Sequence, residues 1–384
     1  MEFYTYRMSD VFERFSSGKN ITEDKISDSG KYPVYGGNGL RGYTDTSNFK
    51  GECILIGRQG AKCGNVRYFN GEGYMTDHAI VGVCKPNHNT QFMNYALASL
   101  DLNRLSGQAA QPGLSVGMLK KQKILLPSLE NQAKIAKILF RYNNLIENNN
   151  RRIALLEKAA QELYKEWFVR FRFPGHETAK FENGLPVGWE IRKIGDIARV
   201  KSGYAFKSEW WSDEGVPVIK IKDIQNNTVD FSDLSKVSET HALLARNFFV
   251  KEGDLLIAMT GATIGKLAIV PFSDEKLVVN QRVGKFFLGD DSVSTVPFLY
   301  CTLQQNWLQE LILMVAGSNA AQPNISPFDI EKIKVIYNEK VVAAFNKKAS
   351  DYISQILLLK KKNQNLAKQR DLLLPRLMSG KLEV

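Results

Sequence analysis

The sequence predicts an α+β protein in which two similar mixed α/β domains are joined by two long antiparallel coiled-coil helices, with pseudo-twofold symmetry. Three observations support this prediction. The phrase GQAAQPGLS at residues 107–115 returns as SNAAQPNIS at residues 318–326. The surroundings of the phrase are repeated as well, which is typical of a duplicated domain. Each copy is also followed by a long helical pattern in which apolar residues have heptad spacing.

The composition is that of a multi-domain soluble protein. The chain has 384 residues, of which 44% are hydrophobic and 24% charged. No stretch approaches the roughly 18 apolar residues that span a bilayer, and the first residues lack a signal peptide's apolar core. We therefore expect a cytoplasmic protein with no membrane partner. The net charge of +11 favours a polyanionic partner, although basicity alone is a weak signal. The four cysteines lack zinc-like spacing, so we expect reduced core thiols and no metal site.

The two copies of the domain are expected over residues 1–128 and 173–337, the second including a linker over residues 173–188. Each copy contains short β-rich runs separated by Gly, Asn and Asp turn residues, a pattern typical of mixed α/β structure. In the second phrase, Ser326 can cap a helix that begins at Pro327. The other matched segments are KYPVYG (31–36) with GVPVIK (215–220), GECILIGRQGAKCGNV (51–66) with GDLLIAMTGATIGKLA (253–268), and MTDHAIVG (75–82) with VVNQRVGK (278–285).

Two long helices are predicted within residues 129–172 and 338–384. In the first, the spacing of the seam residues alternates between 4 and 3, and adding 210 to each number gives the seam of the second helix. The first seam contains Ile135, Leu139, Tyr142, Ile146, Asn149, Ile153, Leu156, Ala160, Leu163 and Trp167. The second seam contains Phe345, Ala349, Tyr352, Ile356, Leu359, Asn363, Leu366, Arg370, Leu373 and Leu377. A narrow apolar stripe needs a partner, and the simplest partner is the other helix.

The twofold relation predicts the register of this antiparallel pair. Asn149 would face Asn363, because a polar residue within an apolar seam commonly fixes the register. The same register pairs Trp167 with Phe345, Leu163 with Ala349, Ala160 with Tyr352, and Ile135 with Leu377.

A search for catalytic motifs finds none that is convincing. The segment GATIGKL at residues 261–267 is similar to a phosphate-binding loop, but it is one residue too short, and Leu267 stands where Ser or Thr should hold magnesium. Zinc-protease and nucleophile-elbow motifs are absent, and the acidic residues are spread out rather than clustered for a metal. We therefore expect no catalytic residue, no metal site and no cofactor bound by this chain.

At this point the chain resembles the specificity (S) subunits of type I restriction–modification enzymes, over essentially its whole length. The resemblance depends on the duplicated domain-and-helix order, LPVGWE at residues 185–190, the two AAQP phrases and RLMSGK at residues 376–381. The first copy departs from the pattern, since it begins at YTYRMSD without an LPxGW motif.

This resemblance implies a non-catalytic DNA-recognition subunit of a restriction system. Residues 1–128 and 173–337 would be target recognition domains, each reading one half of an asymmetric bipartite site in double-stranded DNA. Residues 129–172 and 338–384 would be conserved helical spacers that dock two methyltransferase (M) subunits. S-adenosylmethionine would belong to the methyltransferase, while ATP and Mg would belong to the motor-nuclease (R) subunits, of which up to two can join.

Candidate DNA-binding residues are those whose side chains offer donors to phosphates and base edges. In the first domain they are Asn38, Arg41, Arg58, Gln59, Lys62 and Arg67, with Asn38 and Arg41 expected in a glycine-rich loop. In the second they are Lys220, Lys222, Thr260, Thr263, Lys266, Gln281 and Arg282. The densest charge run, Lys360–Lys362, is either a solvated helix face or a contact to phosphates or to an acidic partner surface.

Two other classes of function stay open. A structural adaptor could bridge two protein partners through the helices without reading sequence, but duplicated basic domains with divergent loops would then be unexplained. A free-standing enzyme with an unrecognised site would show turnover on its own. Competition with scrambled duplexes separates a sequence reader from an adaptor, because an adaptor's DNA affinity would depend on salt but not on sequence.

Overall fold

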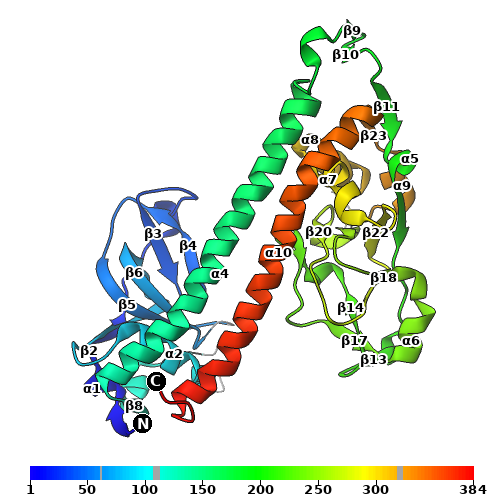
Figure 1. Ribbon diagram of the computed structural model, residues 1–384. Helices are drawn as coiled ribbons and strands as arrows, with labels where there is room; N and C mark the ends of the chain where they lie inside the picture. Colours follow the sequence, from blue (N-terminus) through cyan, green and yellow to red (C-terminus); the bar gives the residue numbers. More distant parts are fainter. Residues whose placement is uncertain (61–62, 107–112, 318–322) are drawn as a thin grey trace. The chain divides into compact units, whose positions relative to one another are not determined.

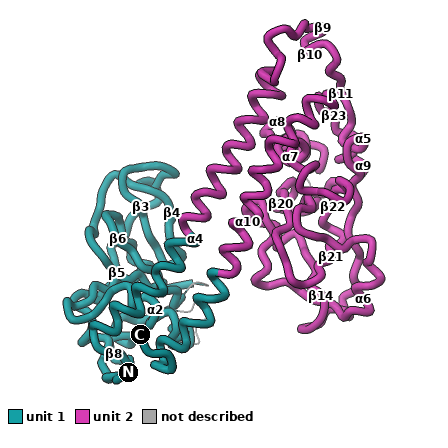
Figure 2. The backbone as a smooth tube through the Cα atoms, in the orientation of Figure 1, with its two compact units in different colours: residues 1–146, 366–384 teal, residues 147–365 magenta. Residues whose placement is uncertain are grey.

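The computed structural model describes residues 1–60, 63–106, 113–317 and 323–384 (Figure 1). The chain forms two compact units, coloured separately in Figure 2. Unit 1 contains Met1–Ile146 and Leu366–Val384, and unit 2 contains Glu147–Asn365. Each unit therefore combines one α/β domain with a part of each long helix. The α+β class, with a duplicated domain and two long helices, is confirmed.

The domain of unit 1 is built on a six-stranded sheet with the order β2-β7-β5-β6-β3-β4. Its strands are β2 (Phe12–Ser17), β3 (Tyr32–Gly36), β4 (Gly39–Thr44), β5 (Phe49–Gly57), β6 (Val66–Met75) and β7 (Ala79–Cys84). A separate antiparallel pair joins β1 (Phe3–Arg7) to β8 (Lys123–Pro127). The short helices are α1 (Met8–Val11), α2 (Thr90–Ala98) and α3 (Val116–Lys121).

The domain of unit 2 has two main sheets, with the orders β12-β22-β19-β20 and β13-β17-β14-β21-β18. Their strands are β12 (Arg199–Ser202), β13 (Trp211–Ser212), β14 (Val216–Ile219), β17 (Ser235–Val237), β18 (Phe249–Val250), β19 (Leu255–Ala258), β20 (Leu267–Ile269), β21 (Leu277–Val279) and β22 (Val283–Phe287). Three two-stranded pairs join β9 (Phe181–Glu182) to β10 (Leu185–Pro186), β11 (Glu190–Lys193) to β23 (Lys334–Tyr337), and β15 (Ile224–Gln225) to β16 (Thr228–Val229). The helices are α5 (Ile194–Ile197), α6 (Glu239–Leu244), α7 (Ser292–Leu303), α8 (Asn306–Val315) and α9 (Pro327–Lys332).

The two domains share a topology, as the sequence repeat predicts. In unit 1, β5 lies between β6 and β7 and β3 pairs with β6 in parallel. In unit 2, β19 lies between β20 and β22 and β14 pairs with β21 in parallel. Ser326 caps α9, which begins at Pro327, as expected. Unit 2 adds β13, β17, β18 and α6 to this shared frame.

Two of the segment alignments were wrong by one residue. Gly57 N donates to Asn65 O at 2.8 Å and Ala258 N donates to Lys266 O at 2.9 Å, so GECILIGRQGAKCGNV matches residues 252–267 rather than 253–268. Lys19 N donates to Met75 O, and Tyr204 N donates to Val279 O, both at 2.9 Å. Met75 is thus equivalent to Val279, so MTDHAIVG matches residues 279–286 rather than 278–285. The sequence comparison misses these shifts because either alignment of each segment places apolar residues opposite one another. The pairing of the strands distinguishes the two alignments.

The two long helices are α4 (Leu129–Tyr164), followed by a π-helical turn over Lys165–Val169, and α10 (Glu339–Met378). Asn338 Oδ1 accepts from Val341 N at 3.0 Å and caps the start of α10. In unit 2 the helices run antiparallel, because Trp167 contacts Phe345 with ring centroids 5.8 Å apart. In unit 1 the fully buried Ile135 and Leu377 belong to one core.

The seam contains a polar pair at the position that the register predicts. Asn149 Nδ2 donates to Asn363 Oδ1 at 2.8 Å, and Asn363 Nδ2 donates to Asn150 Oδ1 at 2.8 Å. Every seam residue named from the sequence is buried or half-buried. The buried stripe of α10 is wider than the heptad seam, however, since Ile353 and Leu357 are 0% and 3% exposed. Both pack in the same hydrophobic core as residues of the α/β domain of unit 2. Heptad spacing identifies only the residues that face the other long helix, so it does not predict the burial of these two.

All four cysteines are free, and Cys53, Cys63 and Cys301 are buried. Within the described ranges, no helix combines the length and apolar character needed to cross a bilayer.

Candidate nucleic-acid interface

The candidate residues of unit 1 gather at one edge of the six-stranded sheet. Arg58 and Gln59 directly follow β5, and Arg67 lies near the start of β6. Asn38 forms the turn between β3 and β4, and Arg41 belongs to β4. The expected glycine-rich loop is thus the short turn at Asn38, whereas the expectation that Arg41 lies in this loop is corrected, because Arg41 lies in strand β4. The paired strand ends hold these side chains on a rigid frame.

Glycines allow the hairpin to approach the arginines closely. A Cβ atom at Gly39 would come within 3.1 Å of Arg67 Cζ, and one at Gly36 within 2.8 Å of Arg41 Cδ. Gly39 also has φ of +108°, which favours glycine. A guanidinium held against backbone in this way loses less side-chain entropy on binding than a freely mobile one.

His78, which the sequence did not single out, lies in the same group. Its Nδ1 atom is 3.1 Å from Gln59 Oε1, and because a carboxamide oxygen can only accept, the imidazole N–H donates. The side chains of both residues are exposed. The sequence signal that could have identified His78 was the repeated segment MTDHAIVG, but the incorrect alignment matched it to the wrong residues of the second copy.

Unit 2 presents a matching edge. Thr260 follows β19, and Gln281 and Arg282 directly precede β22. Met259 N donates to Arg282 O at 3.0 Å, so the strand pairing brings these residues together. Gln281 and Arg282 are exposed, as a contact with DNA would require.

Lys220 and Lys222 are already engaged within unit 2. Lys220 Nζ donates to Ser235 Oγ at 2.8 Å and lies 3.5 Å from the centroid of the Trp211 ring, while burial lowers its pKa. Lys222 Nζ pairs with Asp233 Oδ2 at 2.8 Å, and this contact raises the lysine's pKa. Either ammonium group would have to leave these contacts in order to reach DNA.

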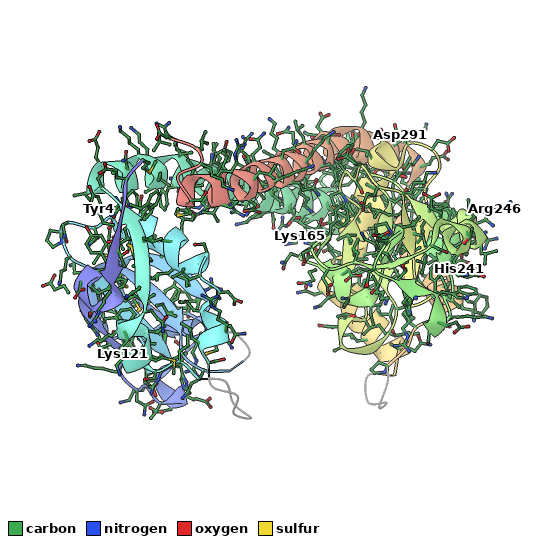
Figure 3. All side chains as sticks on the ribbon, turned by 90° about the horizontal axis from the view of Figure 1, so that it is seen from below. Tyr4, Lys121, Lys165, His241, Arg246 and Asp291 are labelled. Atoms are coloured by element: carbon green, nitrogen blue, oxygen red, sulfur yellow. The ribbon has the colours of Figure 1, made fainter. Side chains whose placement is uncertain are left out.

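Thr263 and Lys266 lie beside two adjoining hollows of about 720 and 550 Å³ on unit 2. Lys266 borders both, Thr263 borders the smaller, and Lys158 and Lys165 border the larger. Figure 3 labels Lys165, which begins the π-helical turn after α4 and pairs with Glu162 at 2.9 Å. In contrast, Lys158 and Lys266 form no ion pair within the described part of the chain. Their ammonium groups are available to an anionic ligand.

The run at Lys360–Lys362 is only partly solvated. Lys360 Nζ donates to Asn227 O at 3.3 Å, and Lys361 Nζ lies 3.4 Å from the centroid of the Phe272 ring. Both contacts lie within unit 2 and tie α10 to its domain. Burial lowers the pKa of Lys360, whereas nearby Glu157, whose pKa burial raises, opposes that shift.

The described ends of the two repeated phrases border these edges. Lys62 and residues 107–112 and 318–322 lie outside the described residues, but the ends of both phrases are described. Gly113 forms an isolated bridge with Gln59, and Asn324 forms one with Thr260. The repetition of the phrase therefore has a structural counterpart, because each copy ends beside a candidate reading loop.

The glycine segment at residues 261–267 is a turn between two strands. A 3₁₀ turn over Gly261–Thr263 joins β19 to β20, and Gly265 N donates to Ala258 O at 2.9 Å. A phosphate loop instead leads from a strand into a helix that offers free N–H groups. Among the described residues, no group of three or more His, Cys, Asp or Glu side chains is placed to hold a metal ion.

This fold defines a class of protein, one in which a duplicated α/β domain is attached to a pair of antiparallel helices. A family model described as "Type I restriction modification DNA specificity domain" matches residues 1–158 and 186–368. The chain therefore belongs to the family of type I restriction–modification specificity proteins.

Individual relatives agree with this family. The specificity subunit of the type I restriction enzyme EcoprrI from Escherichia coli is 44% identical over 129 residues, which cover 34% of this chain and 32% of that protein. The MjaVIII specificity subunit of Methanocaldococcus jannaschii is 27% identical over 281 residues, which cover 71% of this chain and 65% of that protein. The matched stretches thus span less than two thirds of either relative.

The fold has a counterpart among solved structures. The type I restriction–modification S subunit from M. genitalium matches with a TM-score of 0.63 and 20% identity, covering 98% of this chain and 96% of its own. At this level of identity the likeness concerns the fold alone.

Proposed function

We propose that this chain is the DNA sequence-specificity subunit of a type I restriction–modification complex and reads an asymmetric bipartite site. Each α/β domain would read one half-site in double-stranded DNA. The observation that carries the proposal is a shared main-chain frame with different side chains. Gln59 and Thr260 occupy equivalent positions, because each forms an isolated β-bridge to the end of the repeated phrase in its own unit. Arg58 and Met259 are also equivalent, because the Arg58 carbonyl accepts from Leu114 N and the Met259 carbonyl accepts from Ile325 N.

The difference between these side chains favours two different half-sites. Arg58 carries a guanidinium, which can donate two hydrogen bonds to guanine, while Met259 is apolar and 3% exposed. Gln59 is exposed and can both donate and accept, whereas the Thr260 hydroxyl oxygen is buried and has no hydrogen-bond partner among the described residues. Because the frame is shared and the reading groups are not, the two domains would accept different bases.

The helical pair would dock two methyltransferase subunits. Four leucines on α4 and α10 support this idea, because they lie outside the seam and leave half or more of their surface exposed: Leu145 (50%), Leu155 (67%), Leu358 (50%) and Leu372 (64%). Exposed apolar side chains on otherwise polar helices are typical of protein interfaces. Up to two motor-nuclease subunits would complete the complex.

The chain itself would be non-catalytic and would bind no cofactor. S-adenosylmethionine would be held by the methyltransferase, and ATP and Mg by the motor-nuclease. This assignment agrees with the lack of a recognisable catalytic motif in the sequence.

The test is to co-express the chain with its methyltransferase subunit and to map methylated bases across the host genome. We expect one split motif with two different half-sites, separated by bases that are not read. A continuous motif would contradict the two-domain reading. DNA affinity that falls with salt but has no sequence preference would instead indicate an adaptor.

A further inference from the structure

Equivalent main-chain hydrogen bonds show which residues correspond at the strand ends that carry the candidate DNA-binding residues of the two units. Gly18 N donates to Ala79 O at 3.0 Å, and Gly203 N donates to Val283 O at 2.9 Å. Ala79 N donates to Thr76 O at 3.0 Å, and Val283 N donates to Asn280 O at 2.9 Å. These bonds make the start of β7 equivalent to the start of β22.

The residue before β7 is His78, and the residue before β22 is Arg282. Arg58 N donates to His78 O at 3.0 Å, and Met259 N donates to Arg282 O at the same distance. His78 therefore occupies in unit 1 the position that Arg282 occupies in unit 2. Both side chains are exposed on their sheet edges.

Among the described residues, His78 differs from Arg282 in having a side-chain partner on the neighbouring strand end. Its imidazole N–H donates to Gln59 Oε1, and the Gln59 main chain is bridged to Gly113. This bond fixes which side of the carboxamide carries the oxygen. The Gln59 Oε1 atom keeps a second lone pair, and Nε2 keeps its N–H groups, so the carboxamide can still accept and donate at once.

We propose that His78 is a specificity-determining residue of unit 1 that orients Gln59, so that the two act together on one base pair. A carboxamide with a fixed oxygen and nitrogen matches the N6–H donor and N7 acceptor of adenine in the major groove. The histidine is the positioning residue and Gln59 the reading residue. The inference deepens the proposed function and rests on it.

Orientation matters because a free glutamine can present either edge. A rotated carboxamide would offer its donor where adenine also donates, so the hydrogen bond of His78 removes the wrong arrangement before DNA binds. The gain is one of preorganisation, since side-chain freedom is lost in the free protein rather than on binding. Arg282, a donor-only group, would prefer guanine in the other half-site.

The experiment is a double-mutant cycle on the methyltransferase complex with H78A, Q59A and the double variant. Affinity is measured on duplexes in which each base pair of the site is changed in turn. We expect H78A and Q59A to relax the preference at the same base pair, by about 5–100-fold. The double variant should relax it no further than Q59A alone, because the histidine acts through the glutamine.

Two further variants separate positioning from folding and from the function as a whole. H78N places an amide donor near the position of the imidazole N–H and should retain the preference that H78A loses. R282A should relax a base pair in the other half-site only. Unchanged preference in H78A, or effects of H78A and Q59A that multiply in the double variant, would overturn the inference while the bipartite reading stands. A wild-type complex without any base preference would instead overturn the proposed function.

Discussion

The polar pair in the helix seam allows a sharp test of the register. Asn149 is 8% exposed and its Nδ2 donates to Asn363 Oδ1 at 2.8 Å. In N149L, the carboxamide oxygen of Asn363 loses its partner inside the seam. An unsatisfied buried polar group costs about 1–3 kcal/mol, so N149L should lower stability by that amount. For a unit of this size, that corresponds to a fall in Tm of about 2–12 °C.

The double variant N149L/N363L gives the matched control. Both polar groups are then replaced, two leucines face each other, and most of the lost stability should return. Thermal and urea unfolding of the four proteins measure a coupling free energy, which we expect to be about 0.5–3 kcal/mol in favour of the double variant. Strictly additive effects would show that the two side chains do not pair, and the antiparallel register would then be refuted. A stable double variant that populates more than one helix register would further support a role of the pair in specificity rather than stability.

Three other predictions address DNA contact, helix capping and the duplicated frame. K266Q removes an ammonium group that forms no ion pair among the described residues. It should weaken DNA binding about equally on all sequences and reduce the slope of log K against log salt by about 1. K276Q, at an exposed residue that lines neither hollow, should change neither quantity. S326A removes the hydroxyl that caps α9 and should cost about 0.5–2 kcal/mol in urea unfolding; no loss would show that the cap is dispensable. G203A would set a Cβ atom 2.2 Å from Val279 O, and the backbone shift it forces should cost about 1–3 kcal/mol, with wild-type stability contradicting the close approach.

Local patterns were enough to predict the repeat and the helices. The heptad spacing of α4 and α10 depends on 3.5-residue periodicity, which any stretch of sequence displays by itself. The caps at Asn338 and Ser326 are equally local, since each side chain bonds to a backbone N–H three residues further on. The Asn149–Asn363 pairing followed from the same pattern, because the two seams share one spacing and the twofold relation between them sets Asn149 opposite Asn363.

The candidate reading residues were only partly accessible to such reasoning. The sequence placed Arg58 and Gln59 in one loop, but the role of His78 depends on β5 and β7 lying side by side, although 19 residues separate His78 from Gln59. The matching of His78 with Arg282 required a one-residue correction that only hydrogen bonds between strands reveal. Which of these side chains contact DNA stays a prediction.

The sequence by itself thus determined that the chain is duplicated, that each copy ends in a long helix, and how the helices align. Only the tertiary structure decided which side chains share a sheet edge, that Lys220 and Lys222 are already paired, and that Ile353 and Leu357 are buried by the adjoining domain. The physical reason is range. Helix periodicity and capping involve residues three or four positions apart. Sheet pairing and domain contacts instead bring together residues that are far apart in sequence, and their separation in sequence does not indicate their distance in space.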